Sequence, residues 1–495
     1  MTNKGPGPNP VSLFASLSHI VSVTFNEYFM YGPLVKFWAE TKGSLPKERK
    51  DKLSINITNS GQLLVRWQGN RQTSRRLILV AHVDQEGFLL QRFSPHDKEC
   101  QAIPSNDETT FENEKIGERV TIIARHGEYE GKIKHIDRET TPARITFSVD
   151  TRVGPERPDF RECDKFSAIA VYRLPGFNID DDGIIEAPCV DNRAGVSVVT
   201  SVLEGLCAAD WEVNVDVLYT TCEEAGFCGT VRHILAHPEL IANDDLTWIV
   251  VDSSNKNKCL VENLPHDLRH PFDLGRMREE EVVIDLPCAV IRTGDKHHCF
   301  SRQVAQMLHA ASLNASRKIG LATLYPGQCK LQEEFTFCNP DAMKFIRQDA
   351  ASVAGARMIG GWCDASPIFL SPKIIESADS LSLAGSPRIG SLAIPLSNHR
   401  NTFEGRVLPE RCHAAALVMS MVILAEAAKV DWRFPYLDRK GRKNLDDYPD
   451  LCESEARDVA QLKVWLAASK DYFSATDSWL AEARDLLRPH AGIAR

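Results

Sequence analysis

The chain has 495 residues, of which 43% are hydrophobic and 25% are charged, and its formal net charge is −9. This length exceeds a single average domain, so one large domain with an insert, or two to three domains, is expected. The acidic balance excludes the concentrated Lys and Arg that nucleic-acid binders carry. The fourteen cysteines contain no CxxC pair, which favours reduced thiols in the cytoplasm over a disulfide framework.

The N-terminal residues 11–40 mix apolar and polar positions at roughly helical spacing and predict one or two opening helices. They lack a clear small-residue cleavage site, so a secretory signal is not expected. The longest apolar tract, at residues 414–428, falls short of the roughly 18 residues needed to cross a bilayer. It predicts a packed core helix, and no membrane partner is expected.

From Arg76 onward, short apolar runs alternate with helical stretches. LILVAH, VNVDVLYTT and TWIVVD are typical of buried strands, whereas VSVVTSVLEGL and TVRHILAHPEL are typical of helices. The pattern continues with the strand PCAVIRT, a helix from Ser301, the strand LQEEFTF, a helix from Asp341, the strand SLAIPL and a long helix to about Lys429. This alternation predicts an α/β fold with a mostly parallel sheet flanked by helices.

The hydrophobic pattern changes between Phe88 and about Ala187, where short segments of alternating apolar and polar residues are separated by Gly, Pro and acidic turns. These segments predict an inserted β-rich, barrel-like domain. Further on, a polar stretch with prolines and a charge run predicts a loop-rich excursion. The expected domains are an α/β domain split into residues 1–87 and 188–430, the β-rich insert at 88–187, the loop-rich insertion at 253–286 and a helical C-terminal extension at 431–495.

Five segments place His or acidic side chains at or just beyond the ends of predicted strands, where ligands gather in open α/β sheets. The segments contain His82 with Asp84, Asp191, Glu223 with Glu224, Asp252, and His399. Asp84 can orient the His82 imidazole, as partners of metal-bound histidines do. Adjacent acids at a sheet edge repel each other unless a cation compensates them. The mixed set predicts two divalent ions, which are zinc, or else cobalt or manganese.

Each segment taken alone also has a purely structural explanation. A strand-end histidine is commonly just hydrogen-bonded, Asp191 suits a helix N-cap, and two adjacent loop acids are commonly solvated. His297 and His298 are neighbours on an extended segment and would point to opposite faces, which favours surface histidines. His413 is a backup ligand, although its predicted helix position favours packing.

The chain resembles the co-catalytic zinc aminopeptidases of the glutamyl and deblocking type, which include the tetrahedral aminopeptidases. That family shows AHxDExG, a DDRxG-like segment, an EExG pair, a strand-closing Asp and a late His. The present chain has AHVDQEG, VDNRAG, EEAG, VVDSS and SNHRN in that order, and GGWCDASP where the family tends to have GGTDAG. The resemblance covers roughly residues 50–430, and an ordered set of motifs is more specific than any one of them.

The resemblance implies a role for each of these positions. Asp191 would bridge the two metals, His82 and Asp252 would complete one site, Glu224 and His399 would complete the other, Glu223 would be the general base, Asp84 would orient His82, and Asp364 would lie near the substrate. It also implies the β-rich insert and assembly into a homo-oligomer. The chain departs from the family pattern at Gln85, Asn192 and Arg400, where the family tends to have Glu, Asp and a small hydroxyl residue.

The implied activity is a metal-dependent aminopeptidase that removes N-terminal residues from peptides. Two metals would lower the pKa of a shared water, and Glu223 would take its proton and return it to the leaving amine. Two alternatives stay open at this point. One is a two-metal amidohydrolase that deacylates N-acyl amino acids. The other is a scaffold protein of the same fold without turnover, for which the surroundings of His399 and the C-terminal extension are the motive.

Overall fold

The computed structural model describes residues 9–254 and 387–429, each apart from short gaps, together with residues 289–292, 300–319, 347–348 and 363–369. Several predictions fall outside these residues. They are the insertion beyond residue 254, the strand at 331–337, the pair His297 and His298, and the C-terminal extension.

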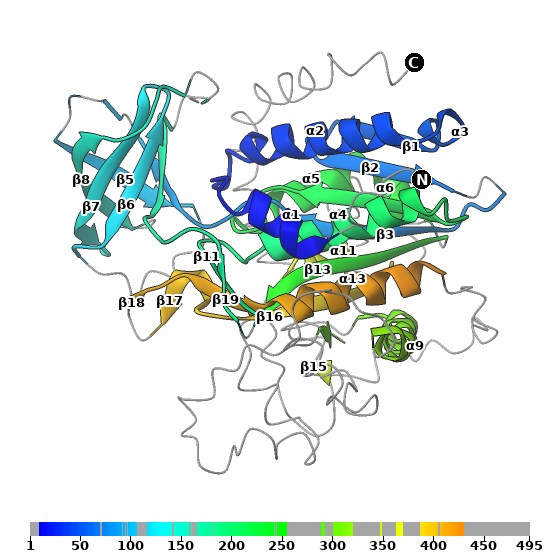
Figure 1. Ribbon diagram of the computed structural model, residues 1–495. Helices are drawn as coiled ribbons and strands as arrows, with labels where there is room; N and C mark the ends of the chain where they lie inside the picture. Colours follow the sequence, from blue (N-terminus) through cyan, green and yellow to red (C-terminus); the bar gives the residue numbers. More distant parts are fainter. Residues whose placement is uncertain are drawn as a thin grey trace, which may run out of the picture.

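A large mixed sheet of 11 strands forms the centre of the molecule (Figure 1). Its strands follow the order β1-β2-β12-β3-β13-β16-β19-β11-β10, with β14 beside β16 and β15 beside β14. They are β1 (Leu53–Ile57), β2 (Leu63–Gln68), β3 (Arg76–His82), β10 (Asn178–Ile179), β11 (Ile184–Ala187), β12 (Asn214–Thr220), β13 (Leu246–Ser254), β14 (Val290–Arg292), β15 (Arg347–Gln348), β16 (Arg388–Ser397) and β19 (Glu410–His413).

The neighbouring strands β12, β3, β13 and β16 run parallel to one another, whereas the strands on either side of this group pair antiparallel to it. The predicted fold class is therefore confirmed, with the parallel arrangement confined to the central strands. Parallel strands need both faces covered, which explains why these runs are almost continuously apolar in the sequence.

Helices cover both faces of the sheet. They are α1 (Pro10–Leu17), α2 (Tyr28–Ser44), α3 (Lys47–Lys50), α4 (Arg193–Ala208), α5 (Cys228–Ala236), α6 (Pro238–Ile241), α9 (Arg302–Ile319), α11 (Ala365–Phe369) and α13 (Ala414–Lys429). The larger core contains side chains of α1, α2, α4, α9 and α13, whereas α5 and α11 contribute to the core of the other face. Along β3, Leu77 and Leu79 enter the first core, and Ile78 and Val80 enter the second, as the two-residue period of a strand requires.

The β-rich insert forms a closed barrel that lies to one side of the main sheet (Figure 1). Its strands follow the order β4-β5-β8-β7-β6-β9 and are β4 (Phe88–Leu90), β5 (Glu99–Pro104), β6 (Arg119–Ala124), β7 (Gly127–Asp137), β8 (Arg144–Arg152) and β9 (Ala168–Tyr172). The barrel has an apolar interior of its own, centred on Phe88 and Phe147. The barrel strands end at Tyr172, and β10 and β11, inside the segment expected to belong to the insert, pair with the main sheet instead.

Two local expectations were wrong. Arg347–Gln348, within the helix predicted from Asp341, form the short strand β15 beside β14. His413, expected in a helix, is the last residue of the strand β19, where it pairs with Ile184 of β11. The helix α13 begins after it. The apolar tract at 414–428 does form a core helix, α13, and none of the described helices is long and apolar enough to cross a membrane.

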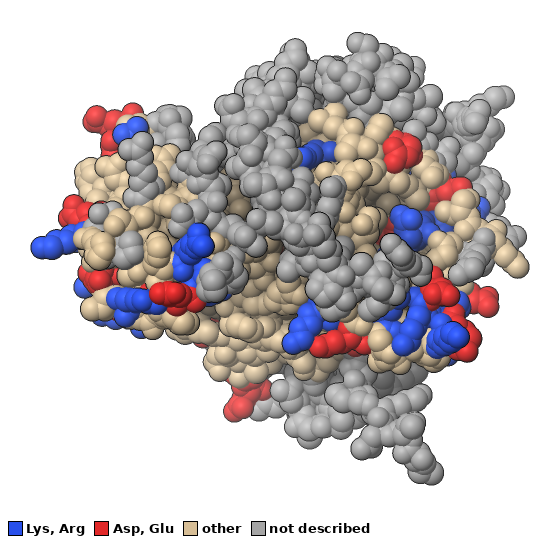
Figure 2. All heavy atoms as spheres, turned by 90° about the horizontal axis from the view of Figure 1, so that it is seen from above, with Lys and Arg blue, Asp and Glu red and all other residues tan. Residues whose placement is uncertain are grey.

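The described part of the face in Figure 2 carries basic and acidic side chains next to each other. Ion pairs of this kind include Lys52 with Asp210 at 2.8 Å and Arg157 with Glu128 at 2.7 Å. A surface with both signs interspersed has little long-range attraction for a charged partner.

Candidate metal centre

The carboxyl ends of β3, β12, β13 and β16 meet at one edge of the sheet, and the predicted site residues gather there. His82 is the last residue of β3, and Glu223 with Glu224 lies in the turn between β12 and α5. Asp252 lies two residues before the end of β13, and His399 opens the short 3-10 turn η3 (His399–Asn401) after β16. The parallel arrangement therefore brings together residues that are up to 317 positions apart in the sequence.

Asp191 approaches the same edge from the segment before α4. The N-cap of α4 is Asn192, whose Oδ1 accepts a hydrogen bond from the backbone N–H of Gly195 at 3.1 Å. The Asn192 side chain also donates to the Val251 carbonyl at 2.8 Å. A Cβ at position 195 would lie 2.1 Å from Asn192 Oδ1, so the motif needs glycine there. The capping role thus falls to Asn192, which leaves the Asp191 carboxylate to face the two histidines.

Asp191 lies between His82 and His399. Its Oδ1 is 3.2 Å from His82 Nε2 and its Oδ2 is 3.2 Å from His399 Nε2. Asp252 Oδ1 lies 3.5 Å from the same His82 nitrogen. Ligand atoms on a tetrahedral metal with bonds of about 2.0–2.1 Å are about 3.3–3.4 Å apart. The spacing of these donor atoms is therefore that of a metal coordination shell.

Among the residues that the structure describes, two groups of donor atoms have all their members within 4.8 Å of one another. One consists of His82, Asp191 and Asp252, and the other of His82, Glu223 and Glu224. The first group matches the predicted set for one ion. In the second group Glu224 lies with His82 rather than with His399, so the pairing of Glu224 and His399 on a common ion stays a prediction. Imidazole with carboxylates suits zinc and neighbouring divalent metals.

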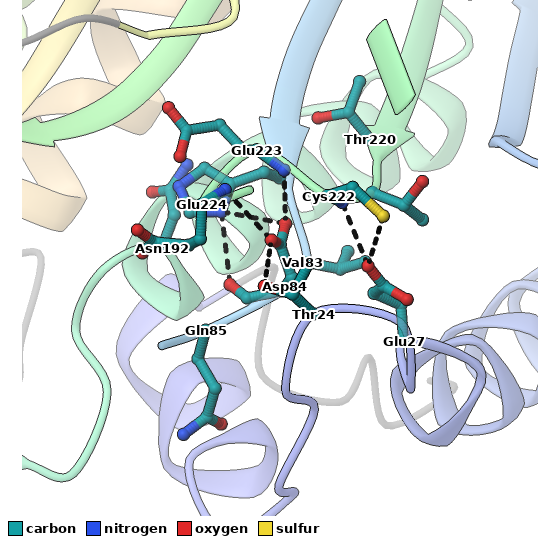
Figure 3. A network of polar contacts seen from close by, with 12 residues as sticks. Thr24, Glu27, Val83, Asp84, Gln85, Asn192, Thr220, Cys222, Glu223 and Glu224 are labelled. Atoms are coloured by element: carbon teal, nitrogen blue, oxygen red, sulfur yellow. Dashed lines mark hydrogen bonds and ion pairs between the residues drawn. The ribbon is translucent and has the colours of Figure 1, made fainter. Parts of the chain in front are cut away.

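Asp84 lies behind the site and is completely buried (Figure 3). Its Oδ1 is 3.4 Å from His82 Nδ1, and it accepts hydrogen bonds from the backbone N–H groups of Glu223 and Glu224, both at 3.1 Å. Thr24 Oγ1 donates to Asp84 Oδ2 at 2.9 Å. One carboxylate thus contacts both the strand end that carries His82 and the turn that carries the two glutamates.

Asp364, which precedes α11, is 1% exposed and accepts hydrogen bonds from the hydroxyls of Thr220 and Thr230. Its charge is near enough to Glu223 to raise the pKa of that side chain. Burial raises the pKa of Asp364 itself to about 6. This position is beneath Glu223, and contact with a substrate stays a prediction.

The acids of this edge carry strongly shifted pKa values. Burial raises the pKa of Glu223 well above its ordinary value, and the neighbouring charge of Asp252 raises it further. Burial and the charge of Glu86 do the same to the pKa of Glu224. Burial opposes ionisation of Asp191, yet the hydrogen bonds from His399 and His82 lower its pKa. Burial lowers the pKa of His82, but Glu223 and three aspartates outweigh it and raise that pKa well above its usual range. A divalent cation among these groups would favour the ionised carboxylates and the neutral imidazoles.

Two features of the site involve residues to which the sequence assigned no role in it. Glu410, 3% exposed in β19, accepts hydrogen bonds from the N–H groups of Val190 at 2.6 Å, Asp191 at 3.0 Å and Arg400 at 2.8 Å. Its carboxylate therefore joins the two segments that carry Asp191 and His399. The one sequence signal for Glu410 was its acidic side chain at a strand position that faces the core.

The second feature is an ion pair between Arg400 Nε and Glu86 Oε1 at 2.7 Å. Arg400 stands where a small hydroxyl residue was expected, and Glu86 follows Gln85 in the first motif. The pair lies beside a cavity of about 560 Å³ whose lining includes Phe88 of the barrel and Leu174. Gln85 accepts hydrogen bonds from the buried Arg193 at 3.0 Å and from the Ser22 N–H at 3.2 Å, so its side chain lies behind the site.

The alternative ligand and the flanking thiols do not join the site. His413 is buried, and its Nδ1 accepts a hydrogen bond from the Ala415 N–H at 3.0 Å, which places the ring at the start of α13. Cys222 and Cys228 are buried free thiols on either side of the glutamate turn.

Comparison with known proteins finds a similar family. Residues 61–257, which contain four of the five ligand segments, match the model of the M42 glutamyl aminopeptidases. The matched stretch is less than half of the chain, and over it the chain is similar to this family. The match supports a hydrolase of peptide bonds. A comparison with curated proteins finds no similar sequence.

Solved structures of this class share the fold at low sequence identity. An aminopeptidase of the archaeon Desulfurococcus kamchatkensis is 16% identical with a TM-score of 0.53, over 84% of this chain and 93% of that one. A TET aminopeptidase from a marine sediment archaeon of the Thaumarchaeota is 12% identical with a TM-score of 0.55, over 85% and 96%. The TET1 peptidase of Pyrococcus horikoshii, which can assemble into a tetrahedron or a large octahedral shell, is 15% identical with a TM-score of 0.51, over 85% and 99%.

Proposed function

We propose that this chain is an aminopeptidase that uses two divalent metal ions, most simply zinc, to remove N-terminal residues from peptides. The observation that carries the proposal is the position of Asp191, whose two carboxylate oxygens each lie 3.2 Å from a different histidine. A carboxylate in that position can serve two ions at once. His82 and Asp252 would hold one of them, and Glu224 and His399 the other.

The bound ions would polarise the scissile carbonyl and acidify the attacking water. Glu223 accepts the proton of that water and transfers it to the leaving amine. The backbone N–H of Glu223 donates to Asp84 at 3.1 Å, which fixes its main chain. Its side chain is half-buried at the sheet edge. Burial raises the pKa of Glu223, and a carboxylate with a raised pKa is a stronger proton acceptor than an exposed glutamate.

Asp84 positions two elements of this chemistry. Its Oδ1 lies 3.4 Å from His82 Nδ1, which favours the tautomer that leaves Nε2 able to bind a cation. The same carboxylate fixes the turn that carries the base. Free-amine recognition is assigned to the acid-rich edge, because an N-terminal ammonium is attracted by the carboxylates that surround it.

We further propose that the chain forms a homo-oligomer. The support is the assembly of the Pyrococcus horikoshii TET1 peptidase, whose fold it shares. Analytical ultracentrifugation should give a mass that is a multiple of 55.2 kDa. A monomer at micromolar concentration would contradict this part of the proposal.

The deciding experiment is hydrolysis of aminoacyl-anilides and their N-acetylated counterparts, before and after chelation, with zinc, cobalt or manganese restored. We expect metal-dependent release from the free-amine set only. Glu223→Gln should lower kcat by about 10²–10⁴-fold with the metal still bound, because it removes only the general base. Glu204→Gln is the matched control, since it neutralises a partly buried acid in α4 away from the sheet edge.

Other outcomes would replace the proposal. Cleavage of the N-acetylated set instead would move the activity to deacylation of N-acyl amino acids. Metal-loaded protein that hydrolyses neither set would establish the scaffold alternative.

A further inference from the structure

The turn that carries the general base is held through its backbone by a series of buried side chains. Four successive N–H groups, those of residues 221–224, donate to side-chain oxygens. The acceptors are Gln62 for the first, Glu27 for the second and Asp84 for the last two, at distances between 2.9 and 3.1 Å. Gln62 and Glu27 both lie outside the motifs, and Glu27 is the ionisable one of the two.

Glu27 lies at the start of α2 and is completely buried. It occupies the N-cap position of that helix, yet its side chain makes no capping hydrogen bond. The carboxylate is directed across to the β12–α5 turn instead, where Oε1 accepts from Cys222 N at 3.0 Å and from Cys222 Sγ at 3.2 Å (Figure 3). An ionisable side chain is rarely buried this deeply unless a specific interaction requires it.

Cys222 has a backbone conformation that needs support. Its φ of 53° lies in the left-handed region, which costs a residue with a Cβ free energy and persists only where its surroundings fix it. The residue also begins the turn, because its carbonyl accepts the Cys228 N–H at 3.1 Å at the start of α5. The direction in which Glu223 leaves the strand therefore depends on the conformation of Cys222.

The contacts of Glu27 separate it from the metal ligands. Asp84 touches both the turn and His82, so its loss would disturb the metal as well as the base. The side chain of Glu27 instead bonds to Cys222 and to the backbone of its own segment. Removing Glu27 should thus affect the base and leave the ligand set in place.

We propose that Glu27 is a positioning residue that holds the Cys222–Glu224 turn, and through it the general base Glu223, by accepting the Cys222 N–H and S–H. This inference rests on the proposed function. What it requires of position 27 is an acceptor oxygen at the end of a three-bond side chain, and a negative charge is not required. Length and charge can therefore be tested separately.

The test compares Glu27→Gln, Glu27→Asp and Glu27→Ala in the full chain. Gln keeps the acceptor at the same reach without a charge, whereas Asp keeps the charge but withdraws it by one methylene. We expect Ala and Asp to lower kcat on an alanyl-anilide by about 10–100-fold, as losses of supporting partners commonly do. KM and the number of bound metal ions should change little, and Gln should restore kcat to within about threefold.

Hydrogen exchange provides a readout that does not depend on turnover. In metal-free protein, exchange of the residue 222–224 amides should become faster in the Asp and Ala variants and stay at the wild-type rate in Gln. Leu206→Ala is the matched control for lost packing, since Leu206 is buried in α4 among apolar neighbours and should leave both readouts unchanged. If Glu27→Ala does not fold, the contrast between Gln and Asp still decides.

Each result has one meaning. An Asp variant that equals wild type, a Gln variant as impaired as Ala, or unchanged exchange in Ala and Asp would overturn the role of Glu27. A wild-type protein that hydrolyses no peptide would overturn the proposed function, while the exchange experiment would still decide whether Glu27 holds the turn.

Discussion

The two ends of β12 carry buried acids in very different surroundings. Near its beginning, Asp216 is 2% exposed and lies between two arginines, with Arg66 Nη2 at 3.1 Å from Asp216 Oδ2 and Arg76 beside Oδ1. Just beyond its other end, Glu223 and Glu224 share the sheet edge with three aspartates and two histidines. The first end balances its charge with its own side chains, whereas the second leaves an excess of negative charge that a cation can neutralise.

The charges around each acid distinguish a structural acid, which has cationic neighbours, from a functional acid, which has anionic neighbours. Burial raises the pKa of Asp216, and the charges of Arg76 and Arg66 offset part of that rise. At the other end, burial raises the pKa of Glu224, and the nearby Glu86, Glu223 and Asp191 raise it further. Buried charges persist when they are paired, so an incompletely paired group indicates a site that takes up a charged ligand.

The largest expected effect is at the acid-rich end. Asp191→Asn should lower kcat/KM by about 10³-fold or more, roughly 4 kcal/mol at 1.36 kcal/mol per factor of ten, because the amide cannot serve two ions. Metal analysis after gel filtration should show reduced binding. Asp180→Asn, a change at an exposed turn before β11, is the control. Full metal content and activity in Asp191→Asn would remove the distinction between the two ends.

Substitution of Asp216, at the end of β12 where arginines balance the charge, should lower the free energy of unfolding and leave kcat unchanged. Asp216→Ala leaves Arg76 buried without its partner and should cost about 3 kcal/mol, the low end for a broken buried pair because Arg66 is 42% exposed. Urea unfolding measures this cost, and kcat of the remaining folded protein should stay within about twofold. Asp210→Ala removes a surface partner of Lys52 and should cost under about 1 kcal/mol. Equal costs for both variants would argue against the comparison.

A pH dependence should distinguish Glu27 from its amide. Burial and the charge of Asp84 raise the pKa of Glu27 from 4.5 to about 7, so folding favours its protonated form. The stability that this provides is complete below pH 4.5 and is lost as pH rises through about 7. Chelator-treated wild type should therefore lose up to about 3 kcal/mol relative to Glu27→Gln over this window, at about 1.4 kcal/mol per pKa unit. Parallel stability curves for the two proteins would be inconsistent with this shift.

Metal removal should give the smallest effect. A ligand at a hundred times its Kd stabilises the folded state by about 2.7 kcal/mol, so chelation should lower the unfolding temperature reversibly. Glu223→Gln should show the same loss as wild type, because it keeps the ligands. Asp191→Asn should show little or none. A chelator effect of equal size in both variants would indicate that the metal binds elsewhere.

Many features of the molecule were available from the order of residues. The apolar runs that form β3, β12, β13 and β16 predict buried strands. The acids and histidines that follow these runs predict a ligand site at the edge of the sheet, because a charged residue rarely closes an apolar run without a partner. The ordered motifs resembled the same family whose model matches residues 61–257. The barrel was predicted from a change in the hydrophobic pattern. Its strands alternate apolar and polar residues, with Phe88 and Phe147 in the interior, whereas the central sheet strands are apolar throughout.

Other features depend on contacts between distant segments. The sequence allowed Asp191 as the cap of α4, and only packing gave that role to Asn192 and left the Asp191 carboxylate facing the histidines. Glu27 lies 195 positions from Cys222, Glu410 lies 219 positions from Asp191, and Glu86 lies 314 positions from Arg400. No local pattern encodes such a partner.

The sequence by itself determined which elements form and which ends of them carry chemistry, because side-chain period and strand-end charges are local properties. Tertiary structure alone decided the strand order β12-β3-β13-β16, and with it which acids share one edge and which, like Asp216, are neutralised at the other. The reason is that buried charges are stabilised or left uncompensated by their neighbours in space, and those neighbours come from segments that the chain order does not bring together.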